Sequence, residues 1–396
     1  MKTKLVIFGI TGDLSRRKLL PALTDIVESG EFPDLSIIGV SRRDVDVSGL
    51  IEQATGKTTL TDLTRVFTMD LAEPSDYVRL KNDLSLQDDE QALIYLSVPP
   101  TAAADIVDFL GEAGLNTPHV KLLFEKPFGF DLESARDFIS RTGNYFEESQ
   151  LYRIDHYMAK EVAARVIGLR SNAENHHHHW SNASVVGVDI IASETIGIED
   201  RAVFYEQTGA LRDFIQGHLM QLLSLVLMDV SAPFSIEDLA DRRHQALERV
   251  RVANPAQARR AQYNGYDKEV ENPGSQTETF VSVELASEDE KWQGVKLRLI
   301  TGKALDQKRS AVIVRYNDGT EDVFEEGSVV STDERLPDAY ERVLVEAIRS
   351  RKYIFTSSPE VIRSWEILAR LQESWSMNQY PLEFYIPGSS IDAVIA

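Results

Sequence analysis

The sequence predicts two domains of different fold class: an α/β domain with a parallel sheet, then an α+β domain with a mainly antiparallel sheet. The chain has 396 residues, more than the roughly 100–200 residues of one typical domain. Its first part alternates strand-like apolar runs with helical patterns, which is typical of a parallel sheet wound with helices. Past about Gln150 a long helical stretch is followed by strand-like runs that turns separate.

The first domain is expected to span residues 1–150. Because parallel strands need crossover connections, its helical segments are expected to link the strands of one sheet. The alternating segments are Lys4–Gly9, Lys18–Glu28, Leu35–Val40, Ala92–Val98, Ala102–Ala113 and Val120–Phe124.

The second domain is expected to span residues 151–396, with helices on one side of its sheet. A helical stretch, Glu206–Met228, comes first, and the turn Asn317–Gly319 follows the last of three strand-like runs. The strand-like runs are Thr277–Glu284, Val295–Thr301 and Ala311–Tyr316, and helical periodicity returns over Ala339–Arg349 and Pro359–Ser374.

The composition is that of a globular enzyme and excludes several classes of function. Lys and Arg number 42 against 63 Asp and Glu, a formal net charge of -21, which argues against nucleic-acid or anionic-membrane binding. Cysteine is absent, so disulfides, thiolate metal sites and a cysteine nucleophile are excluded. No segment approaches the ~20 apolar residues of a membrane span, and the N-terminus enters a strand-like run at once. We therefore expect no signal peptide and a cytoplasmic protein.

A loop with two glycines, GITGDLSRRK at residues 9–18, follows the first expected strand. Gly9 and Gly12 would let backbone N–H groups approach a pyrophosphate, whose charge the next helix N-terminus favours. The usual third glycine is absent, and two glycines also fit a plain turn. The position at the first strand-to-helix connection favours dinucleotide binding.

The second expected strand ends in Ser41-Arg42-Arg43, where an NAD site usually carries a carboxylate for the ribose hydroxyls. Arg42 suits the 2′-phosphate of NADP, so NADP is the expected cofactor. Surface arginines after a strand are the alternative, and Asp44 leaves NAD open.

Two histidine-containing segments could carry chemistry. In YRIDHYMAKE, residues 152–161, a helix would place His156, Tyr157 and Lys160 in one donor-rich patch that suits a phosphoryl group; a solvated helix face is the alternative. The tract His176–His179 could bind a metal, but adjacent histidines rarely converge in one ligand shell. A solvated loop or an engineered remnant is the expected interpretation, and no metal site is predicted.

Five segments in order closely resemble the glucose-6-phosphate dehydrogenase family over nearly the whole chain. They are GITGDL (9–14), LSVPPT (96–101), FEKPFG (124–129), YRIDHYMAKE (152–161) and TGKALDQKR (301–309). EKP alone also occurs in sugar oxidoreductases of the glucose–fructose oxidoreductase type, whereas RIDHY with Lys160 is highly specific. The resemblance implies a Rossmann-type first domain and oxidation of glucose 6-phosphate to 6-phosphogluconolactone with NADP, in the oxidative pentose phosphate pathway.

The resemblance also implies roles for individual residues. His218 matches the base that takes the C1 hydroxyl proton and Asp155 matches its partner, although a lone histidine in an apolar helix is more often a core residue. The matches to substrate-binding residues are Lys126, His156, Tyr157, Lys160, Glu194, Asp213, Lys303 and Lys308. The matches to cofactor-binding residues are Gly9, Thr11, Gly12, Asp13, Leu14, Arg42, Pro99 and Lys126.

The chain departs from the family pattern in places, and other functions stay open. Between Tyr316 and Leu336 it is much shorter, so part of the large sheet, which builds the family's dimer interface, is expected to be missing. The resemblance therefore leaves a homo-oligomer with a shortened sheet interface open, and it does not imply the second NADP site of animal members. The surroundings of Glu194 also depart from the family's glycine-richer stretch. The alternatives are a dehydrogenase of another sugar or sugar phosphate and a catalytically silent NADP-binding protein.

Overall fold

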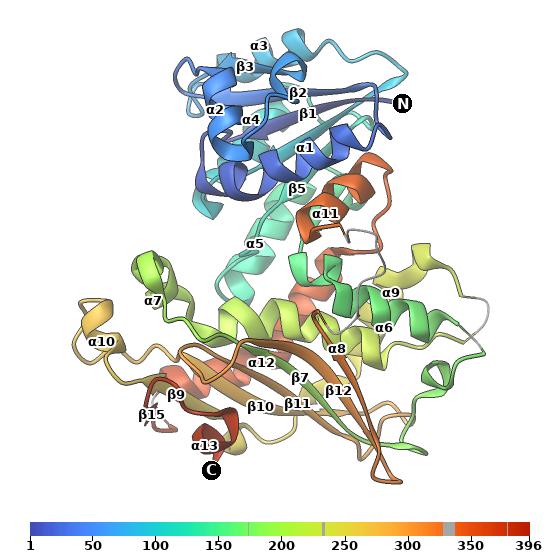
Figure 1. Cartoon of the computed structure of the whole chain (residues 1–396), viewed down its shortest axis with the longest axis vertical. Helices are drawn as coiled ribbons and strands as arrows, with labels where there is room; N and C mark the ends of the chain where they lie inside the picture. The colour runs from blue at the N-terminus through green and yellow to red at the C-terminus, as the bar shows by residue number, and fades with distance from the viewer. Residues whose placement is uncertain (173, 232–233, 328–336, 378) are drawn as a thin grey trace. The chain divides into compact units, whose positions relative to one another are not determined.

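The computed structural model describes residues 1–172, 174–231, 234–327, 337–377 and 379–396, which form two compact units (Figure 1). The first unit comprises Met1–Gly129, Glu133–Ala159 and Leu336–Ser358, and the second comprises Phe130–Leu132, Lys160–Arg335 and Pro359–Ala396. The predicted domains, 1–150 and 151–396, are continuous in sequence, whereas each unit is assembled from separate segments. Of the expected shortened stretch between Tyr316 and Leu336, residues 328–336 lie outside the described part of the chain.

The first unit is built on a seven-stranded sheet with the order β14-β6-β5-β4-β1-β2-β3. Strands β1 to β6 pair in parallel, as expected, and only β14 pairs antiparallel, with β6. The strands are β1 (Lys2–Phe8), β2 (Leu35–Ser41), β3 (Thr64–Thr68), β4 (Glu90–Leu96), β5 (Val120–Phe124), β6 (Leu151–Ile154) and β14 (Phe355–Thr356). Phe8, the last residue of β1, pairs with Val40 and with Leu96, so the carboxyl ends of three strands meet at one edge.

Helices connect these strands, and local sequence signals set where some of them begin and end. The Asp46 side chain caps α2 by accepting from the Gly49 N–H at 3.1 Å, and Gly56 ends that helix with φ 69°. Asp338 and Glu341 form a capping box at the start of α11. The helices are α1 (Leu20–Glu28), α2 (Val47–Thr55), α3 (Pro74–Leu84), α4 (Pro100–Glu112), α5 (Leu132–Gly143) and α11 (Ala339–Ile348). Shorter turns of helix are η1 (Ser15–Leu19), η2 (Thr61–Leu63), η3 (Glu148–Gln150) and η4 (His156–Ala159).

The second unit contains an eight-stranded sheet with the order β13-β12-β7-β11-β10-β9-β15, and β8 also pairs with β10. Only β7 with β11 and β9 with β15 pair in parallel, so the sheet is mainly antiparallel, as expected. The strands are β7 (Val185–Ser193), β8 (Val250–Val252), β9 (Arg259–Tyr263), β10 (Phe280–Ser287), β11 (Lys296–Gly302), β12 (Arg309–Tyr316), β13 (Glu321–Glu325) and β15 (Glu383–Tyr385). The predicted turn joins β12 to β13, with Gly319 at φ 85°.

Figure 1 shows helices α6, α8 and α12 across one face of this sheet and α13 on the other. The predicted helical stretch from Glu206 is interrupted, because Gly209 has φ 63° and ψ 176° and kinks it. The helices are α6 (Glu161–Ser171), α7 (Ala202–Ala210), α8 (Met220–Leu227), α9 (Leu239–Glu248), α10 (Tyr266–Glu269), α12 (Ser358–Ser376) and α13 (Ile391–Ile395). Shorter helical turns are η5 (His176–His179), η6 (Glu199–Arg201), η7 (Leu211–Leu219), η8 (Ile236–Asp238) and η9 (Pro255–Gln257).

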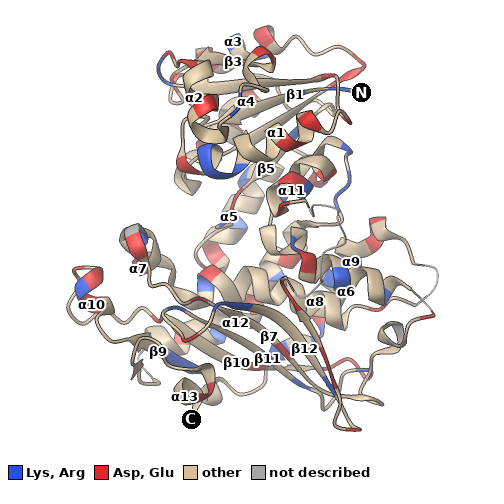
Figure 2. Cartoon of the chain, in the orientation of Figure 1, with Lys and Arg blue, Asp and Glu red and all other residues tan. Residues whose placement is uncertain are grey.

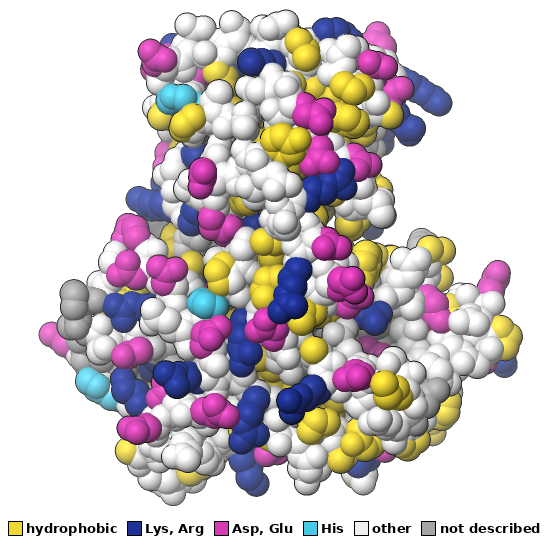
Figure 3. Space-filling model, turned by 180° about the vertical axis from the view of Figure 1, so that it is seen from behind, with side chains coloured by type: hydrophobic (Ala, Val, Ile, Leu, Met, Phe, Trp, Pro, Cys, Tyr) yellow, Lys and Arg dark blue, Asp and Glu magenta, His cyan; other side chains and the backbone are white. Residues whose placement is uncertain are grey.

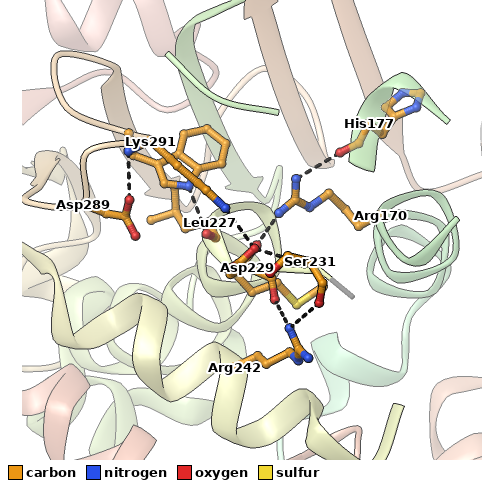
Figure 4. A network of polar contacts seen from close by, with 10 residues as sticks. Arg170, His177, Leu227, Asp229, Ser231, Arg242, Asp289 and Lys291 are labelled. Carbon is orange, nitrogen blue, oxygen red and sulfur yellow. Dashed lines mark hydrogen bonds and ion pairs between the residues drawn. The ribbon is translucent and has the colours of Figure 1, made fainter. Parts of the chain in front are cut away.

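A polar network holds the end of α8 in place (Figure 4). Asp229 accepts hydrogen bonds from the Ser231 N–H and hydroxyl at 3.0 and 2.9 Å and from Lys291 Nζ at 3.0 Å. Arg242 donates to the Asp229 carbonyl at 2.7 Å, and the buried Arg170 donates to the His177 carbonyl at 2.9 Å. Burial alone would raise the pKa of Asp229, but the hydrogen bonds from Ser231 and the hydrogen bond and charge of Lys291 outweigh it and lower the pKa to about 2.

The excess acidic charge is spread over the surface. Figure 2 shows Asp and Glu along elements of both units with Lys and Arg between them, and the face in Figure 3 is similarly mixed. Within the described residues, no helix combines the length and apolar character that crossing a bilayer requires.

Candidate active site

The expected cofactor residues follow strands of the first sheet at its carboxyl edge. Gly9 follows β1, Arg42 follows β2, Pro99 follows β4 and Lys126 follows β5. Strand β1 lies between β2 and β4, so the chain leaves β1 where the strand order reverses. In parallel α/β sheets, this is where ligands bind.

Gly9 makes the closest backbone approach in this loop. It has φ 83°, and a Cβ atom on it would lie 2.3 Å from the Ser97 carbonyl oxygen, a separation that no side chain permits. The Gly12 N–H donates to the Gly9 carbonyl at 2.9 Å, which closes a tight turn before η1. Only glycine fits at position 9, and the space beside it suits a ligand that approaches the backbone closely.

Ser15 also holds this turn, although the sequence pattern did not single it out. Its buried hydroxyl donates to the Gly9 carbonyl at 2.9 Å and lies 3.4 Å from the Ser97 hydroxyl. The sequence signal for this residue is its position, because Ser15 directly follows the GITGDL segment. Basic side chains follow at once in η1, namely Arg16, Arg17 and Lys18, so this loop concentrates positive charge in an acidic chain.

Most of the remaining predicted cofactor residues lie at the surface of the first unit. Thr11, Asp13, Arg42 and Pro99 are exposed, and Leu14 is half-buried. Asp13 is paired with Arg17 at 2.7 Å. Pro99 is the N-cap residue of α4, so the α4 N-terminus faces the same edge of the sheet as the glycine loop.

Asp155, His156 and Tyr157 follow β6 at this edge. Asp155 is 2% exposed, and its Oδ1 accepts from the Tyr157 N–H at 3.0 Å. The His156 ring contacts the Tyr157 ring, with centroids 5.1 Å apart, and stacks on Tyr340 of α11 at 6.2 Å. The first unit therefore places a buried carboxylate directly before a short helical turn that begins with a histidine.

One expectation about this segment is wrong. We predicted that His156 and Lys160 share one face of a continuous helix, but η4 ends at Ala159 and Lys160 is the N-cap of α6, with an extended ψ of 161°. Lys160 also belongs to the second unit, whereas His156 belongs to the first. The Nζ atom of Lys160 is paired with Oε2 of Glu326 at 3.2 Å.

His218 lies in η7 of the second unit, a helix of π type that starts just after Gly209. Hydrogen bonds in a π-helix join residues five apart, which places Asp213 and His218 about one turn apart. The His218 side chain is largely buried, and its ring lies edge-on to Phe214 at 5.6 Å. Wide helical turns of this type are frequent at functional sites.

Glu194 and Lys303 meet because they follow the parallel strands β7 and β11. The Lys303 ammonium donates a short hydrogen bond to Glu194 Oε2. It also lies 5.1 Å from the Tyr205 ring centroid and 5.9 Å from the Phe214 ring centroid. The structure thus groups Glu194 and Lys303 beside η7, whereas Lys308 is exposed on the loop before β12.

Comparison with known proteins agrees with this geometry. Residues 6–164 match "Glucose-6-phosphate dehydrogenase, NAD binding domain", and residues 168–334 and 327–393 match "Glucose-6-phosphate dehydrogenase, C-terminal domain". The chain belongs to the glucose-6-phosphate dehydrogenase family. The predicted resemblance is therefore confirmed.

Relatives in this family match over almost their whole length. The glucose-6-phosphate 1-dehydrogenases of Gluconobacter oxydans and Helicobacter pylori are each 30% identical, with 97% and 96% of this chain and 93% and 95% of the relative covered. A Mycobacterium avium glucose-6-phosphate 1-dehydrogenase structure has a TM-score of 0.84 at 28% identity, covering 98% of this chain and 94% of that one. A glucose-6-phosphate dehydrogenase in complex with glucose-6-phosphate shares the fold, with a TM-score of 0.89 at 23% identity, covering 98% and 95%.

The histidine tract of this family member does not behave as expected at His177. The solvated-loop interpretation is wrong there, because the ring is buried between Trp180 and Phe324, with centroids 5.2 and 5.6 Å away. Its Nε2 lies 3.0 Å from Asp322 Oδ2. In the part of the chain that the structure describes, no group of three or more His, Asp or Glu side chains could hold a metal ion.

Proposed function

We propose that this chain oxidises glucose 6-phosphate at C1 to 6-phosphogluconolactone and transfers the hydride to NADP, as the entry step of the oxidative pentose phosphate pathway. The observation that carries the proposal is the family match through both units, which includes the strand-end segment with Asp155 and the π-type segment with His218. The curated relatives carry the name glucose-6-phosphate 1-dehydrogenase.

In the proposed reaction, His218 accepts the proton of the C1 hydroxyl. Its burial keeps bulk water from the imidazole, so proton acceptance is directed to the substrate. Bound NADP would supply the hydride acceptor. Asp155 would hold the imidazole in the tautomer that presents a free nitrogen and stabilise the imidazolium. Asp155 and His218 belong to different units, so their pairing stays a prediction.

The substrate is proposed to bind through two groups of side chains. His156, Tyr157, Lys160 and Lys308 would donate to the phosphate, whose several acceptor oxygens favour charged donors. Glu194, Asp213 and Lys303 would bind sugar hydroxyls, and Lys126 would contact both sugar and cofactor. The observed bond between Lys303 and Glu194 supports this assignment, because each group fixes the other before substrate arrives.

The cofactor is proposed to bind at the glycine loop, with Gly9 and Gly12 admitting the pyrophosphate. The close approach of Gly9 to Ser97 supports a cradle that a side chain would fill. Exposed Arg42 would bind the 2′-phosphate, which favours NADP over NAD. Thr11, Asp13, Leu14 and Pro99 would line the same site.

An absorbance assay at the NADPH band tests the proposal. Glucose 6-phosphate with NADP should give turnover, and free glucose should give very little. Turnover only with another sugar phosphate would assign that compound as the substrate in place of glucose 6-phosphate. No turnover with any sugar and either cofactor, although NADP binds, would indicate a catalytically silent NADP-binding protein. A cytoplasmic location remains a prediction, which cell fractionation tests. A homo-oligomer with a shortened sheet interface stays open, and light scattering distinguishes it from a monomer.

A further inference from the structure

The loop between β11 and β12 carries two of the proposed substrate ligands, Lys303 and Lys308. Lys303 directly follows β11, and Ala304 after it has φ 50°. This is a left-handed backbone conformation, which is unfavourable for a residue that has a Cβ atom. Contacts with the rest of the second unit must therefore hold the loop in this shape.

On one side the loop is hydrogen-bonded to the segment that follows β7. The Ala304 N–H donates to the Ile196 carbonyl at 2.8 Å, and the Leu305 N–H donates to the Glu194 carbonyl at 2.9 Å. These bonds fix the loop backbone beside the contact already described, in which the Lys303 ammonium donates to the Glu194 carboxylate. The loop conformation and the proposed sugar site are therefore linked.

On its other side the loop is hydrogen-bonded to the C-terminal part of the chain, between β15 and α13. The buried Tyr385 hydroxyl donates to the Lys303 backbone carbonyl at 2.6 Å. Two further backbone bonds join the same segments: the Gly388 N–H donates to the Ala304 carbonyl at 2.7 Å, and the Asp306 N–H donates to the Ser389 carbonyl at 3.1 Å. We call residues 385–389 the C-terminal clamp.

The C-terminal clamp is anchored to the large sheet at both of its ends. Strand β15 pairs in parallel with β9, which places Tyr385 opposite Tyr263. At the other end, α13 buries Val394 in a hydrophobic core of this unit, and Ile391 and Ile395 pack against the same core. Because both ends are fixed, the clamp can restrain the loop that it contacts.

We propose that Tyr385 is a positioning residue for substrate binding. The C-terminal clamp holds the loop so that the Lys303 ammonium meets Glu194 at the sugar site. The inference rests on the proposed function, because Lys303 is a proposed ligand of the sugar hydroxyls. Without the clamp, the backbone at Ala304 would relax to negative φ, and the Lys303 ammonium would turn away from Glu194.

The first test is the steady-state kinetics of Tyr385→Phe, which removes one hydroxyl and keeps the ring. The KM for glucose 6-phosphate should rise about two- to tenfold, the loss expected for one hydrogen bond, while kcat and the KM for NADP change little. Tyr263→Phe is the matched control, because Tyr263 lies in the same core and its hydroxyl donates to Glu269 instead. This control should keep the wild-type KM.

A double variant shows whether Tyr385 acts through Lys303. In a Lys303→Ala background, Tyr385→Phe should raise the KM for glucose 6-phosphate no further, because the side chain that the clamp positions is gone. An unchanged KM in Tyr385→Phe, or equal rises in the wild-type and Lys303→Ala backgrounds, would overturn the proposal. An equal rise of KM in Tyr263→Phe would also overturn it.

Hydrogen exchange of the loop amides is a second readout, which does not depend on activity. The N–H groups of Leu305 and Asp306 should exchange roughly two- to tenfold faster in Tyr385→Phe and at the wild-type rate in Tyr263→Phe. Val394→Ala weakens the anchor of α13 and should also speed this exchange, which keeps the test available if Tyr385→Phe folds poorly. Unchanged exchange in both loosened variants would overturn the proposal. Faster exchange, in a chain whose wild type does not oxidise glucose 6-phosphate, would instead overturn the proposed function alone.

Discussion

The ammonium of Lys160 is paired with the carboxylate of Glu326, 166 residues later in the chain, at 3.2 Å. Lys160 is a proposed phosphate ligand, so Glu326 competes with the substrate for the same positive charge. Glu326→Gln should lower the KM for glucose 6-phosphate by about two- to fivefold, because a partly exposed ion pair contributes about 0.2–1 kcal/mol. Glu325→Gln, which removes a carboxylate from Arg309 instead, is the matched control in steady-state kinetics. An unchanged KM in Glu326→Gln would show that Glu326 does not compete with the substrate for Lys160.

Gly9 and Gly30 have similar backbone conformations but different surroundings, so their alanine variants can be compared. Both have positive φ, 83° and 72°, but a Cβ on Gly9 would clash with the Ser97 carbonyl while one on Gly30 would meet nothing within 4 Å. Gly9→Ala should abolish measurable NADP binding, whereas Gly30→Ala should only lower the free energy of unfolding, by about 1 kcal/mol. Calorimetric titration and thermal unfolding measure the two effects. Normal NADP affinity in folded Gly9→Ala would show that the cradle is not needed.

Arg42→Ala should weaken the binding of NADP about ten- to a hundredfold and the binding of NAD far less. The guanidinium can form paired hydrogen bonds to a 2′-phosphate, and charge-assisted bonds contribute about 1.5–3 kcal/mol. Arg43→Ala, the adjacent exposed arginine, serves as control. Dissociation constants for both cofactors decide the matter, and equal losses for NADP and NAD would exclude Arg42 from this role.

His218→Asn should reduce kcat by about a hundred- to ten-thousandfold, because it removes the proton acceptor, while glucose 6-phosphate and NADP still bind. Asp155→Asn should lower kcat by a comparable or smaller factor. The double variant should lose little more, since the two residues act as a unit. Wild-type turnover should fall at acid pH, where an imidazolium cannot accept a proton.

The measurements for this pair are kcat and ligand affinities of each variant, after circular dichroism confirms folding. Near-normal turnover in His218→Asn would contradict the mechanism. Additive losses in the double variant would contradict the pairing with Asp155.

Asp229 should make the free energy of unfolding depend on pH in the acid range. Its pKa in the folded chain, about 2, is below the unfolded value of about 3.9. The stabilisation is therefore complete above about pH 4 and is lost as the pH falls toward 2. Since the side chain is 52% exposed, solvent screening limits the effect to about 1 kcal/mol. Asp229→Asn should remove this dependence in urea unfolding, whereas Asp241→Asn, exposed on α9, should not.

Much of the first unit could be predicted from the chain itself. Strands β1, β2, β4 and β5 are apolar runs buried on both faces, and such runs are visible in any buried parallel sheet. Strand β3 was missed because Thr64–Thr68 is short and mostly polar or half-exposed. Strand β14, two residues long, was missed because it exists only through its pairing with β6.

Local sequence determined the fold classes, the glycine loop and the family motifs, because strand periodicity, turn residues and loop glycines act over a few neighbouring positions. Only the tertiary structure decided which side chains meet. Lys160 with Glu326, Lys303 with Glu194 and Tyr95 with Glu125 are separated by 166, 109 and 30 residues. Whether a charged side chain is paired depends on burial and on neighbours from other strands. This burial and these neighbours exist only once the strands have packed into sheets, so the local sequence does not reveal them.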